Sequence, residues 1–350
     1  MKSRSSFGQQ WHGYLGASRL STLARALALW ASVALLAASC APYIVPAKDQ
    51  THHPTIFGSR YHTDDGEILP IRAWGPRPPT ANAIILALHG FGDYRNAFDR
   101  LGMQLADLGV RTYAFDQRGF GEGPGRGYWH GGDRMIEDAA DAVSILAGHY
   151  PETPVYLLGH SMGGAIAMAT LAERSELPLA GILAVAPAVW GRAFMPGYQR
   201  RALDASAHTL PWLWVSGQGL DRVPSDNIPM LRALARDPHI LRYYRIDTVW
   251  GLTNLMDRAL RSAPRIKEPA LFLYGLRDQL VPRAPTRAVL AKIPPENLTV
   301  AVYEDGHHML LRDKAGDQVI YDIAAWLWNK RLALPSGAET DWKAHFGEGR

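Results

Sequence analysis

The sequence predicts an α/β fold: a mostly parallel sheet covered by helices on both faces, with an inserted helical cap. Short apolar runs of strand length alternate with amphipathic stretches of helix length over most of residues 56–330. This alternation is typical of parallel sheets with both faces buried. A stretch rich in aromatic residues and methionine, 188–264, interrupts the alternation and is too long for a loop. We therefore expect one large domain with a cap inserted after a strand at 180–185.

The first expected elements are two strand-like runs, 56–63 and 68–74, separated by a turn at 64–66. At the other end of the chain, residues 331–350 have the composition of a polar, weakly ordered tail. Ligands of parallel sheets collect at the carboxyl ends of the strands, so a site is expected in the loops that follow them. The remaining expected elements are strands at 84–88, 110–115, 155–158, 180–185, 270–274 and 298–303, and helices at 97–108, 134–149, 162–174, 285–293 and 315–330.

Residues 1–39 have the composition of a secretory signal peptide. Arg19 and Arg25 come at the start of an apolar run, 26–38, and small residues follow it. A run of this length is short for a stable transmembrane helix, for which about 20 residues are needed. We therefore expect this segment to direct export.

The end of this segment, Ala37-Ala38-Ser39-Cys40, resembles the processing box of a bacterial lipoprotein signal, although Leu36 lies one place earlier than the usual leucine. The resemblance implies that Cys40 is lipidated and that residues 40–55 are a tether. Ala41, in place of aspartate, favours the outer membrane, with the protein facing the periplasm. The alternative is an ordinary signal peptide and a soluble periplasmic or secreted protein.

Charge and cysteine content exclude several classes of protein. The four basic residues within 1–39 account for the whole formal net charge of +4, so the rest of the chain is neutral and gives no support for a nucleic-acid partner. With one cysteine, the chain cannot form an internal disulfide. The glycine-rich run 119–132 contains no phosphate-binding motif, and His52-His53 lacks partners at ligand spacing. We therefore expect no cofactor and no metal.

The most informative motif is Gly159-His160-Ser161-Met162-Gly163, which follows an aliphatic run and precedes an alanine-rich helical stretch. Strand, sharp turn and helix form the context that a nucleophile elbow requires. A Cβ at either glycine would crowd the strand against the helix. Ser161 is therefore the candidate nucleophile.

A serine hydroxyl needs a base to take its proton, and the base needs an orienting partner. In folds with this elbow the order along the chain is serine, acid, histidine. The candidate acid is Asp278, which comes just after the apolar run 270–274. Two adjacent histidines, His307 and His308, follow the last strand, and spacing alone does not choose between them.

An oxyanion hole requires backbone N–H groups that point at the reacting oxygen. One candidate donor is Met162, directly after the nucleophile, and the other is Phe91 in the loop His89-Gly90-Phe91-Gly92. His89 and His160 are expected to be structural. Arg118, in Asp116-Gln117-Arg118-Gly119, is expected to brace the loops beneath the site.

Taken in order, these motifs resemble the monoacylglycerol lipase and lysophospholipase branch of the α/β-hydrolases, within the S33-like, Hydrolase-4 grouping. The resemblance spans about residues 56–330 and includes the position of the cap. In that family the catalytic histidine comes five residues after an aromatic residue, in a pattern such as Tyr-x-x-x-x-His-x-Leu. Counted from Tyr303, with Leu310 following, the pattern selects His308.

The resemblance implies a serine hydrolase that cleaves carboxylic esters of lipids with Ser161, His308 and Asp278. The apolar cap and the lipid anchor implied at Cys40 also point to a lipid ester substrate and a membrane. A general short-chain carboxylesterase and an acyltransferase use the same triad and stay open. A fold does not guarantee activity, so a non-catalytic binding protein of the envelope is the alternative from another class.

Overall fold

The computed structural model describes residues 23–30, 32, 41–217, 219 and 221–347. Its central sheet has nine strands in the order β1-β2-β3-β5-β4-β6-β7-β10-β11. The pairs from β5 to β11 are parallel, and β1, β2 and β3 form an antiparallel edge. The strands are β1 (Thr55–Phe57), β2 (Arg60–His62), β3 (Ile68–Trp74), β4 (Ala83–Leu88), β5 (Val110–Phe115), β6 (Val155–His160), β7 (Leu179–Val185), β10 (Ala270–Gly275) and β11 (Leu298–Tyr303).

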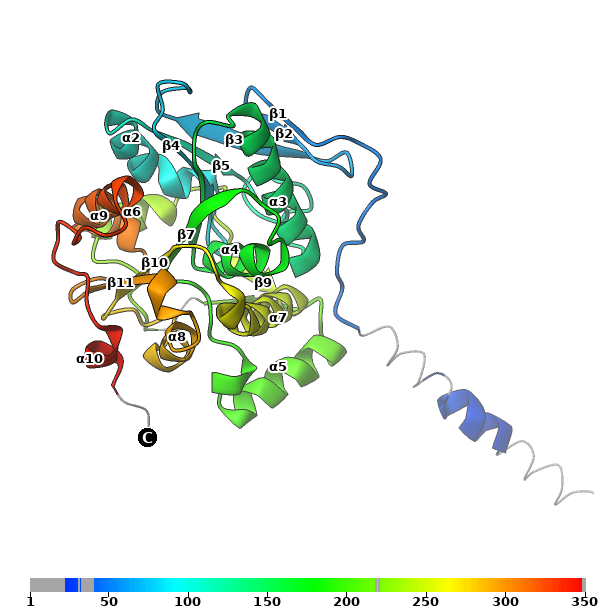
Figure 1. Ribbon diagram of the computed structural model, residues 1–350. Coiled ribbons are helices and arrows are strands. Elements are labelled where there is room, and N and C mark those ends of the chain that lie inside the picture. Colours follow the sequence, from blue (N-terminus) through cyan, green and yellow to red (C-terminus); the bar gives the residue numbers. More distant parts are fainter. Residues whose placement is uncertain (1–22, 31, 33–40, 218, 220, 348–350) are drawn as a thin grey trace, which may run out of the picture.

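Helices cover both faces of this sheet, which confirms the predicted fold class (Figure 1). Alternate residues of β4 enter two separate cores: Ile84 and Leu86 pack with α3 and α4, while Ile85 packs with α2 and α9. Because both faces are buried, the strands consist of continuous apolar residues. The helices of this part are α2 (Asp99–Asp107), α3 (Gly132–His149), α4 (Met162–Glu173), α8 (Arg283–Leu290) and α9 (Gly316–Trp328).

Short 3-10 helices join several elements. They are η1 (Arg95–Phe98), η2 (Arg192–Phe194), η3 (Ala263–Arg265), η4 (Pro295–Asn297) and η5 (Leu310–Arg312). The expected strand-like run 56–63 differs from the structure, where it forms β1 and β2. A turn with Gly58 at φ 59° separates these two strands. Positive φ favours glycine, which has no Cβ to clash.

The cap region between β7 and β10 contains α5 (Gly197–Thr209), α6 (Ile228–Leu234) and α7 (Ile246–Ser262). It also contains a two-stranded antiparallel hairpin of β8 (Trp214–Ser216) and β9 (Tyr243–Arg245). The sequence predicted a mostly helical cap without this hairpin, because three-residue strands carry too little periodicity to be recognised. α7 packs on α4, the helix that follows the nucleophile elbow.

The structure differs from the prediction at the C-terminal end. Residues 331–347 pack against the sheet rather than forming a weakly ordered tail. Leu334 is buried, the Val302 N–H donates to the Ala338 carbonyl at 2.8 Å, and Trp342 and Phe346 of α10 (Trp342–Phe346) contact the core. A few apolar residues separated by polar ones were enough to anchor the segment.

Residues 41–54 contain no helix or strand, but they lie on the body. The Val45 N–H donates to the Trp129 carbonyl at 2.8 Å, and the His52 N–H donates to the Asp64 carbonyl at 2.9 Å. Cys40 lies outside the described residues, as does most of the expected signal segment. Within the part of the chain that is described, no helix is both long enough and apolar enough to cross a membrane.

Candidate active site

The nucleophile elbow lies between β6 and α4. Ser161 has φ 53° and ψ −115°, one of two non-glycine residues with positive φ in the described chain. A conformation of this kind costs about 1–3 kcal/mol and persists only where the surroundings enforce it. The surroundings are close: a Cβ on Gly159 would lie 2.2 Å from the Gly163 carbonyl oxygen, and one on Gly163 would lie 2.0 Å from the Leu88 carbonyl oxygen. The glycines therefore allow strand, turn and helix to pack around the serine.

Ser161, His308 and Asp278 form one hydrogen-bonded chain. The Nε2 atom of His308 lies 3.0 Å from the Ser161 Oγ, and its Nδ1 lies 2.8 Å from the Asp278 Oδ2. The three residues follow β6, β10 and β11, so the sheet brings Ser161 to Asp278 and His308, which lie more than a hundred positions further along the chain. This geometry lets the imidazole accept the serine proton while the carboxylate orients the ring.

The Asp278 carboxylate is held as an anion. Its Oδ1 accepts the N–H groups of Leu280 at 2.7 Å and Val281 at 3.0 Å, which leaves Oδ2 for His308. Burial disfavours the charge, but the His308 ring and the two backbone donors outweigh burial and hold the pKa of Asp278 below its usual value. The negative charge of Asp278 is therefore available to stabilise a protonated His308.

The two adjacent histidines point to different partners. His308 faces Ser161, whereas the His307 Nδ1 lies 3.6 Å from the Asp313 Oδ2 and the His307 N–H donates to the same oxygen at 2.7 Å. The structure thus places the residue that the family pattern selected, His308, next to the serine. His307 holds the loop to Asp313.

His160 and His89 form hydrogen bonds with the backbone of the loops around the site. The His160 Nε2 lies 2.9 Å from the His308 carbonyl oxygen, which makes it the donor of that bond. Burial, with the charge of His308, lowers the pKa of His160 to about 3, so its ring is neutral. The His89 Nε2 accepts the Gln117 N–H at 3.0 Å, and the Gln117 side-chain amide donates to the His89 carbonyl at 2.9 Å. Both histidines are structural, as expected.

Arg118 lies in a buried ion network beneath these loops. Its guanidinium donates two hydrogen bonds of 2.7 Å to Asp65 and two, of 2.6 and 3.0 Å, to Asp138. All three side chains are almost fully buried. A buried arginine shared by two carboxylates fixes the segments that carry them, which agrees with the expected bracing role.

The loop expected to supply the oxyanion hole is clamped by the cap. The Phe91 ring stacks on Tyr244 with centroids 4.6 Å apart, and the Leu241 N–H donates to the Gly92 carbonyl at 2.9 Å. The Phe91 N–H itself has no acceptor among the described residues. The Met162 N–H begins α4, where the first N–H groups of a helix lack intrahelical acceptors. The loop that carries Phe91 lies close to the serine, since a Cβ on Gly90 would lie 3.3 Å from the Ser161 Cβ.

Sequence reasoning missed the clamp. Tyr94 also takes part in it, because its hydroxyl donates to the Asp237 carboxylate at 2.6 Å. The contacts connect residues about 150 positions apart. The aromatic content of the cap was visible in the sequence, but no local pattern pairs Tyr244 with Phe91.

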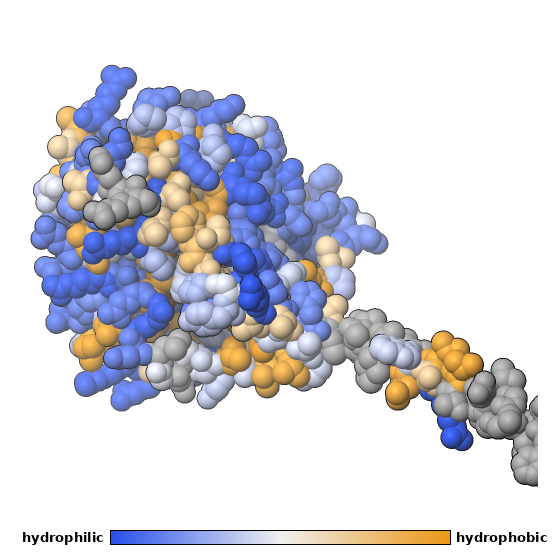
Figure 2. Space-filling model, turned by 90° about the horizontal axis from the view of Figure 1, so that it is seen from below, coloured by the Kyte–Doolittle hydropathy of each residue, from blue (hydrophilic) through white to orange (hydrophobic). Residues whose placement is uncertain are grey.

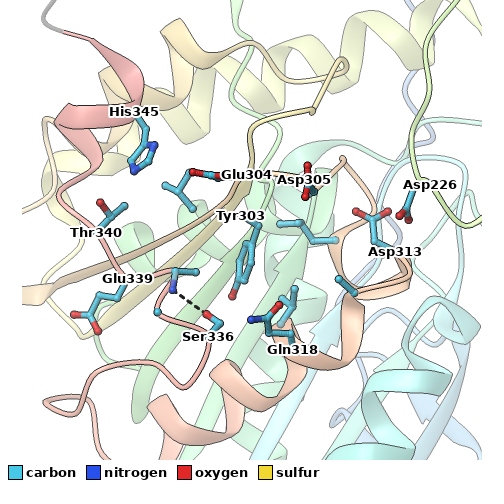
Figure 3. A pocket seen from close by; sticks show the side chains of 17 residues that line it. Asp226, Tyr303, Glu304, Asp305, Asp313, Gln318, Ser336, Glu339, Thr340 and His345 are labelled. Carbon is cyan, nitrogen blue, oxygen red and sulfur yellow. Dashed lines mark hydrogen bonds between the residues drawn. The ribbon is translucent and has the colours of Figure 1, made fainter.

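Beside the histidine loop lies a cavity of about 480 Å³ that none of Ser161, His308 and Asp278 lines. Figure 3 shows Asp226 and Asp313 close together at one end of this cavity and His345 at the other. Its lining is polar and rich in carboxylates, so it does not suit an acyl chain. It is separate from the triad.

Asp226, His307 and Asp313 form a group whose potential metal-binding atoms lie within 4.8 Å of one another. Both carboxylates already have partners in the protein. Asp226 accepts the Lys314 N–H at 2.8 Å, and Asp313 accepts the Ser225 hydroxyl at 2.6 Å in addition to the His307 N–H. These bonds connect the cap residues to the histidine loop, and we interpret the group as structural.

The parallel sheet, the elbow and the Ser161–His308–Asp278 chain define an α/β-hydrolase with a serine nucleophile site. Residues 79–315 match the model of the serine aminopeptidase S33 family, Hydrolase_4. The match covers more than half of the chain, and the protein belongs to this family.

Several relatives carry names that refer to glycerides. The chain is 29% identical over 276 residues to the human monoglyceride lipase, covering 75% of this chain and 88% of the relative. It is 27% identical over 285 residues to the rat monoglyceride lipase, covering 77% and 89%. It is 26% identical over 271 residues to the monoacylglycerol lipase of Mycolicibacterium smegmatis, covering 73% and 90%.

Solved structures show the same fold. The monoacylglycerol lipase of Paleococcus ferrophilus superimposes with a TM-score of 0.62 at 24% identity, covering 74% of this chain and 98% of the other. A soluble variant of the Saccharomyces cerevisiae monoglyceride lipase gives a TM-score of 0.64 at 19% identity, covering 83% and 98%. The likeness supports the fold class.

Proposed function

We propose that the protein is a serine hydrolase that cleaves carboxylic esters of single-chain lipids, of the monoacylglycerol or lysophospholipid type. The observation that carries this proposal is the hydrogen-bonded chain of Ser161, His308 and Asp278 at the end of a strained elbow. The names of the relatives and the apolar side chains of the cap support a lipid rather than a small polar ester.

The reaction proceeds through an acyl-serine ester. His308 takes the proton of Ser161 as the Oγ attacks the ester carbonyl, and a tetrahedral intermediate forms. The protonated His308 then donates that proton to the oxygen of the leaving alcohol as the ester bond breaks. In the second half a water molecule, deprotonated by His308, attacks the acyl-serine and releases the carboxylic acid. Asp278 orients the ring and stabilises its charge throughout.

The developing oxyanion is bound by the N–H groups of Phe91 and Met162. Such donors stabilise the tetrahedral intermediate more than the substrate, and losing one typically lowers the rate about a hundred- to thousandfold. The Phe91 donor depends on its loop, which the cap holds through Leu241 and Tyr244. Cap and catalytic loop thus form one unit.

The serine assignment is tested by Ser161→Ala. We expect ester hydrolysis to fall by at least about a thousandfold and labelling by a fluorophosphonate probe to disappear, with an unchanged thermal unfolding midpoint. Retained hydrolysis in this variant would overturn the proposal. Absence of probe labelling in folded wild-type protein would instead favour a non-catalytic envelope binding protein.

The substrate class is tested by a panel of acyl esters from short to long chain, with glycerol and phosphate-containing head groups. A lipid hydrolase is expected to prefer long acyl chains, because each buried methylene contributes about 0.8 kcal/mol. A sharp preference for short soluble esters would favour a general carboxylesterase. Formation of a new ester in the presence of an added alcohol would favour an acyltransferase.

We further propose that residues 1–39 are a cleaved signal, that Cys40 carries lipid, and that the protein lies at the periplasmic face of the outer membrane. The basic and apolar composition of this segment and the small residues before Cys40 support the proposal. Mass spectrometry of the N-terminal peptide is expected to begin at a triacylated Cys40. An unmodified Cys40, or a chain cleaved elsewhere, would contradict it.

A further inference from the structure

The β8–β9 hairpin of the cap and the two residues before it expose a group of large apolar side chains. Trp212, Leu213, Trp214 and Tyr243 are 49%, 46%, 46% and 54% exposed, and we call these four residues the aromatic face. Trp214 and Tyr243 lie on the same side of the hairpin, because Trp214 pairs with Arg245 and Tyr243 lies two residues before it. Tryptophan and tyrosine are the residue types enriched where a protein meets lipid headgroups.

The segment that follows Cys40 reaches the body beside the aromatic face. The Tyr43 N–H donates to Asp247 at 3.4 Å, and the Tyr43 ring meets the edge of Tyr128 with centroids 5.9 Å apart. The Arg245 guanidinium, which is across the hairpin from Trp214, lies 4.9 Å from the centre of the Tyr128 ring. Figure 2 shows an apolar group of side chains where the N-terminal segment meets the rest of the molecule.

The reach of this segment limits where an anchor can lie. Tyr43 lies three positions after Cys40, and an extended chain spans at most about 3.3–3.6 Å per residue. Acyl chains on Cys40 therefore enter a bilayer within about 11 Å of Tyr43. A protein held at this point has the adjoining side of its cap at the bilayer surface.

The charge of the cap favours an anionic surface. Residues 188–264 contain ten arginines and six aspartates, with no lysine and no glutamate, whereas the chain after residue 39 is neutral as a whole. Basic residues near an anionic bilayer are attracted to it, and the attraction falls with ionic strength.

The aromatic face is also close to the site. Successive residues of a strand point to opposite sides. Tyr243 is exposed, and its neighbour Tyr244 stacks on Phe91 of the oxyanion loop. One face of β9 is therefore exposed to solvent, and the opposite face contacts the catalytic loop.

From these observations we infer that the aromatic face lies on a bilayer containing anionic phospholipid and is held there by the short segment after Cys40. The inference rests on the anchor proposed at Cys40. It gives the enzyme a fixed orientation, with the cap between the bilayer and Ser161, so that a single-chain lipid ester enters the site from the membrane rather than from bulk water.

Thiol protection tests this orientation. Lipidation blocks Cys40, the only cysteine of the chain, so Trp214→Cys or Tyr243→Cys places the one reactive thiol on the aromatic face. Full-length lipidated variants in phosphatidylglycerol-containing vesicles are treated with a membrane-impermeant maleimide. The same substitutions in a Cys40→Ser chain in buffer give the reference rate. The control is Met103→Cys on α2, which is 56% exposed and covers the other face of the sheet.

We expect maleimide labelling at both hairpin positions to be at least fivefold slower in vesicles than in buffer, with no change at the Met103→Cys control. Equal rates would overturn the inference, and equal protection in neutral phosphatidylcholine vesicles would overturn its charge component. Hydrolysis of a soluble ester tests the catalytic proposal independently of membrane binding. The mass of the N-terminal peptide shows whether Cys40 carries lipid. If Cys40 carries no lipid, the aromatic face is tested by cosedimentation of the chain with anionic vesicles. Binding that Trp214→Ser abolishes would support the inference, and no binding would overturn it.

Discussion

Tyr244 provides the sharpest test of the link between cap and catalysis. Its ring stacks on Phe91 at 4.6 Å and 29°, and its hydroxyl donates to the Leu241 carbonyl at 2.7 Å. It also closes over Gly92, where an added Cβ would lie 2.2 Å from the Tyr244 hydroxyl. Tyr244→Ala removes these contacts and leaves Phe91, with its N–H donor, held by its edge contact with Phe120 at 5.4 Å and by the backbone bond from Leu241 to Gly92. Tyr244 is therefore a positioning residue.

The expected loss of rate in Tyr244→Ala lies between two limits, loss of the aromatic pair alone and complete loss of the Phe91 N–H donor. An aromatic pair contributes about 0.5–1.5 kcal/mol beyond its buried area, and each 1.36 kcal/mol corresponds to about a tenfold change in rate. Complete loss of the donor would cost about a hundred- to thousandfold. We therefore expect Tyr244→Ala to lower kcat for a soluble short-chain ester about ten- to a hundredfold, with a smaller change in KM.

The assay compares kcat and KM for Tyr244→Ala, Tyr244→Phe and Tyr198→Ala. Tyr244→Phe keeps the ring and loses one hydrogen bond, so its kcat is expected within about threefold of wild type. Tyr198 is 71% exposed on α5 and serves as the matched control, with no expected change. A Tyr244→Ala protein with wild-type kcat, at an unchanged unfolding midpoint, would refute the idea that the cap positions the oxyanion loop.

Three further predictions concern the triad and its support. Asp278→Asn is expected to lower kcat about ten-thousandfold with the fold retained, measured as ester turnover and near-UV circular dichroism; a loss below tenfold would remove Asp278 from the mechanism. Because the folded pKa of Asp278 is depressed, its contribution to stability is present above the ordinary carboxyl pKa near 4 and is lost as the pH falls through the folded value. Urea midpoints of wild type should therefore fall more steeply below about pH 4 than those of Asp278→Asn, and parallel curves would contradict this. Arg118→Met leaves Asp65 buried without its cation, whereas Asp138 keeps Arg134, whose Nε donates to it at 3.1 Å. The variant is expected to cost about 3–5 kcal/mol in urea unfolding; a loss below about 1 kcal/mol, on the order of a surface pair, would refute the bracing role.

The sequence predicted the fold class and most strands because the relevant signals are local. The buried strands are continuous apolar runs, and β11 begins and ends at the residues expected. The elbow was also predictable, since Gly159 and Gly163 are required by contacts with immediate neighbours and with β4. Local sequence was therefore sufficient to predict the nucleophile elbow at Ser161.

The choice between His307 and His308 was not a local matter. Both lie in one loop, and they bind different carboxylates: His307 binds Asp313, six residues further on, and His308 binds Asp278, which follows another strand. The family pattern selected the residue that the structure places beside Ser161, but spacing by itself did not.

The cap and the C-terminal segment were least predictable. The β8–β9 hairpin consists of three-residue strands 27 positions apart, and its Tyr244 acts on a loop 150 positions away. At the C-terminal end, Leu334, Trp342 and Phe346 pack on the sheet from a stretch that is polar on average. In both places long-range contacts, rather than periodicity, determine the structure.

The most direct test of the central claim is the rate at which a fluorophosphonate modifies Ser161, located by mass spectrometry of the labelled peptide. If His308 is the base, His308→Ala should slow this modification at least about a thousandfold, whereas His307→Asn should leave it within about tenfold of wild type. Rapid modification of Ser161 in His308→Ala, or its selective loss in a folded His307→Asn protein, would contradict the account.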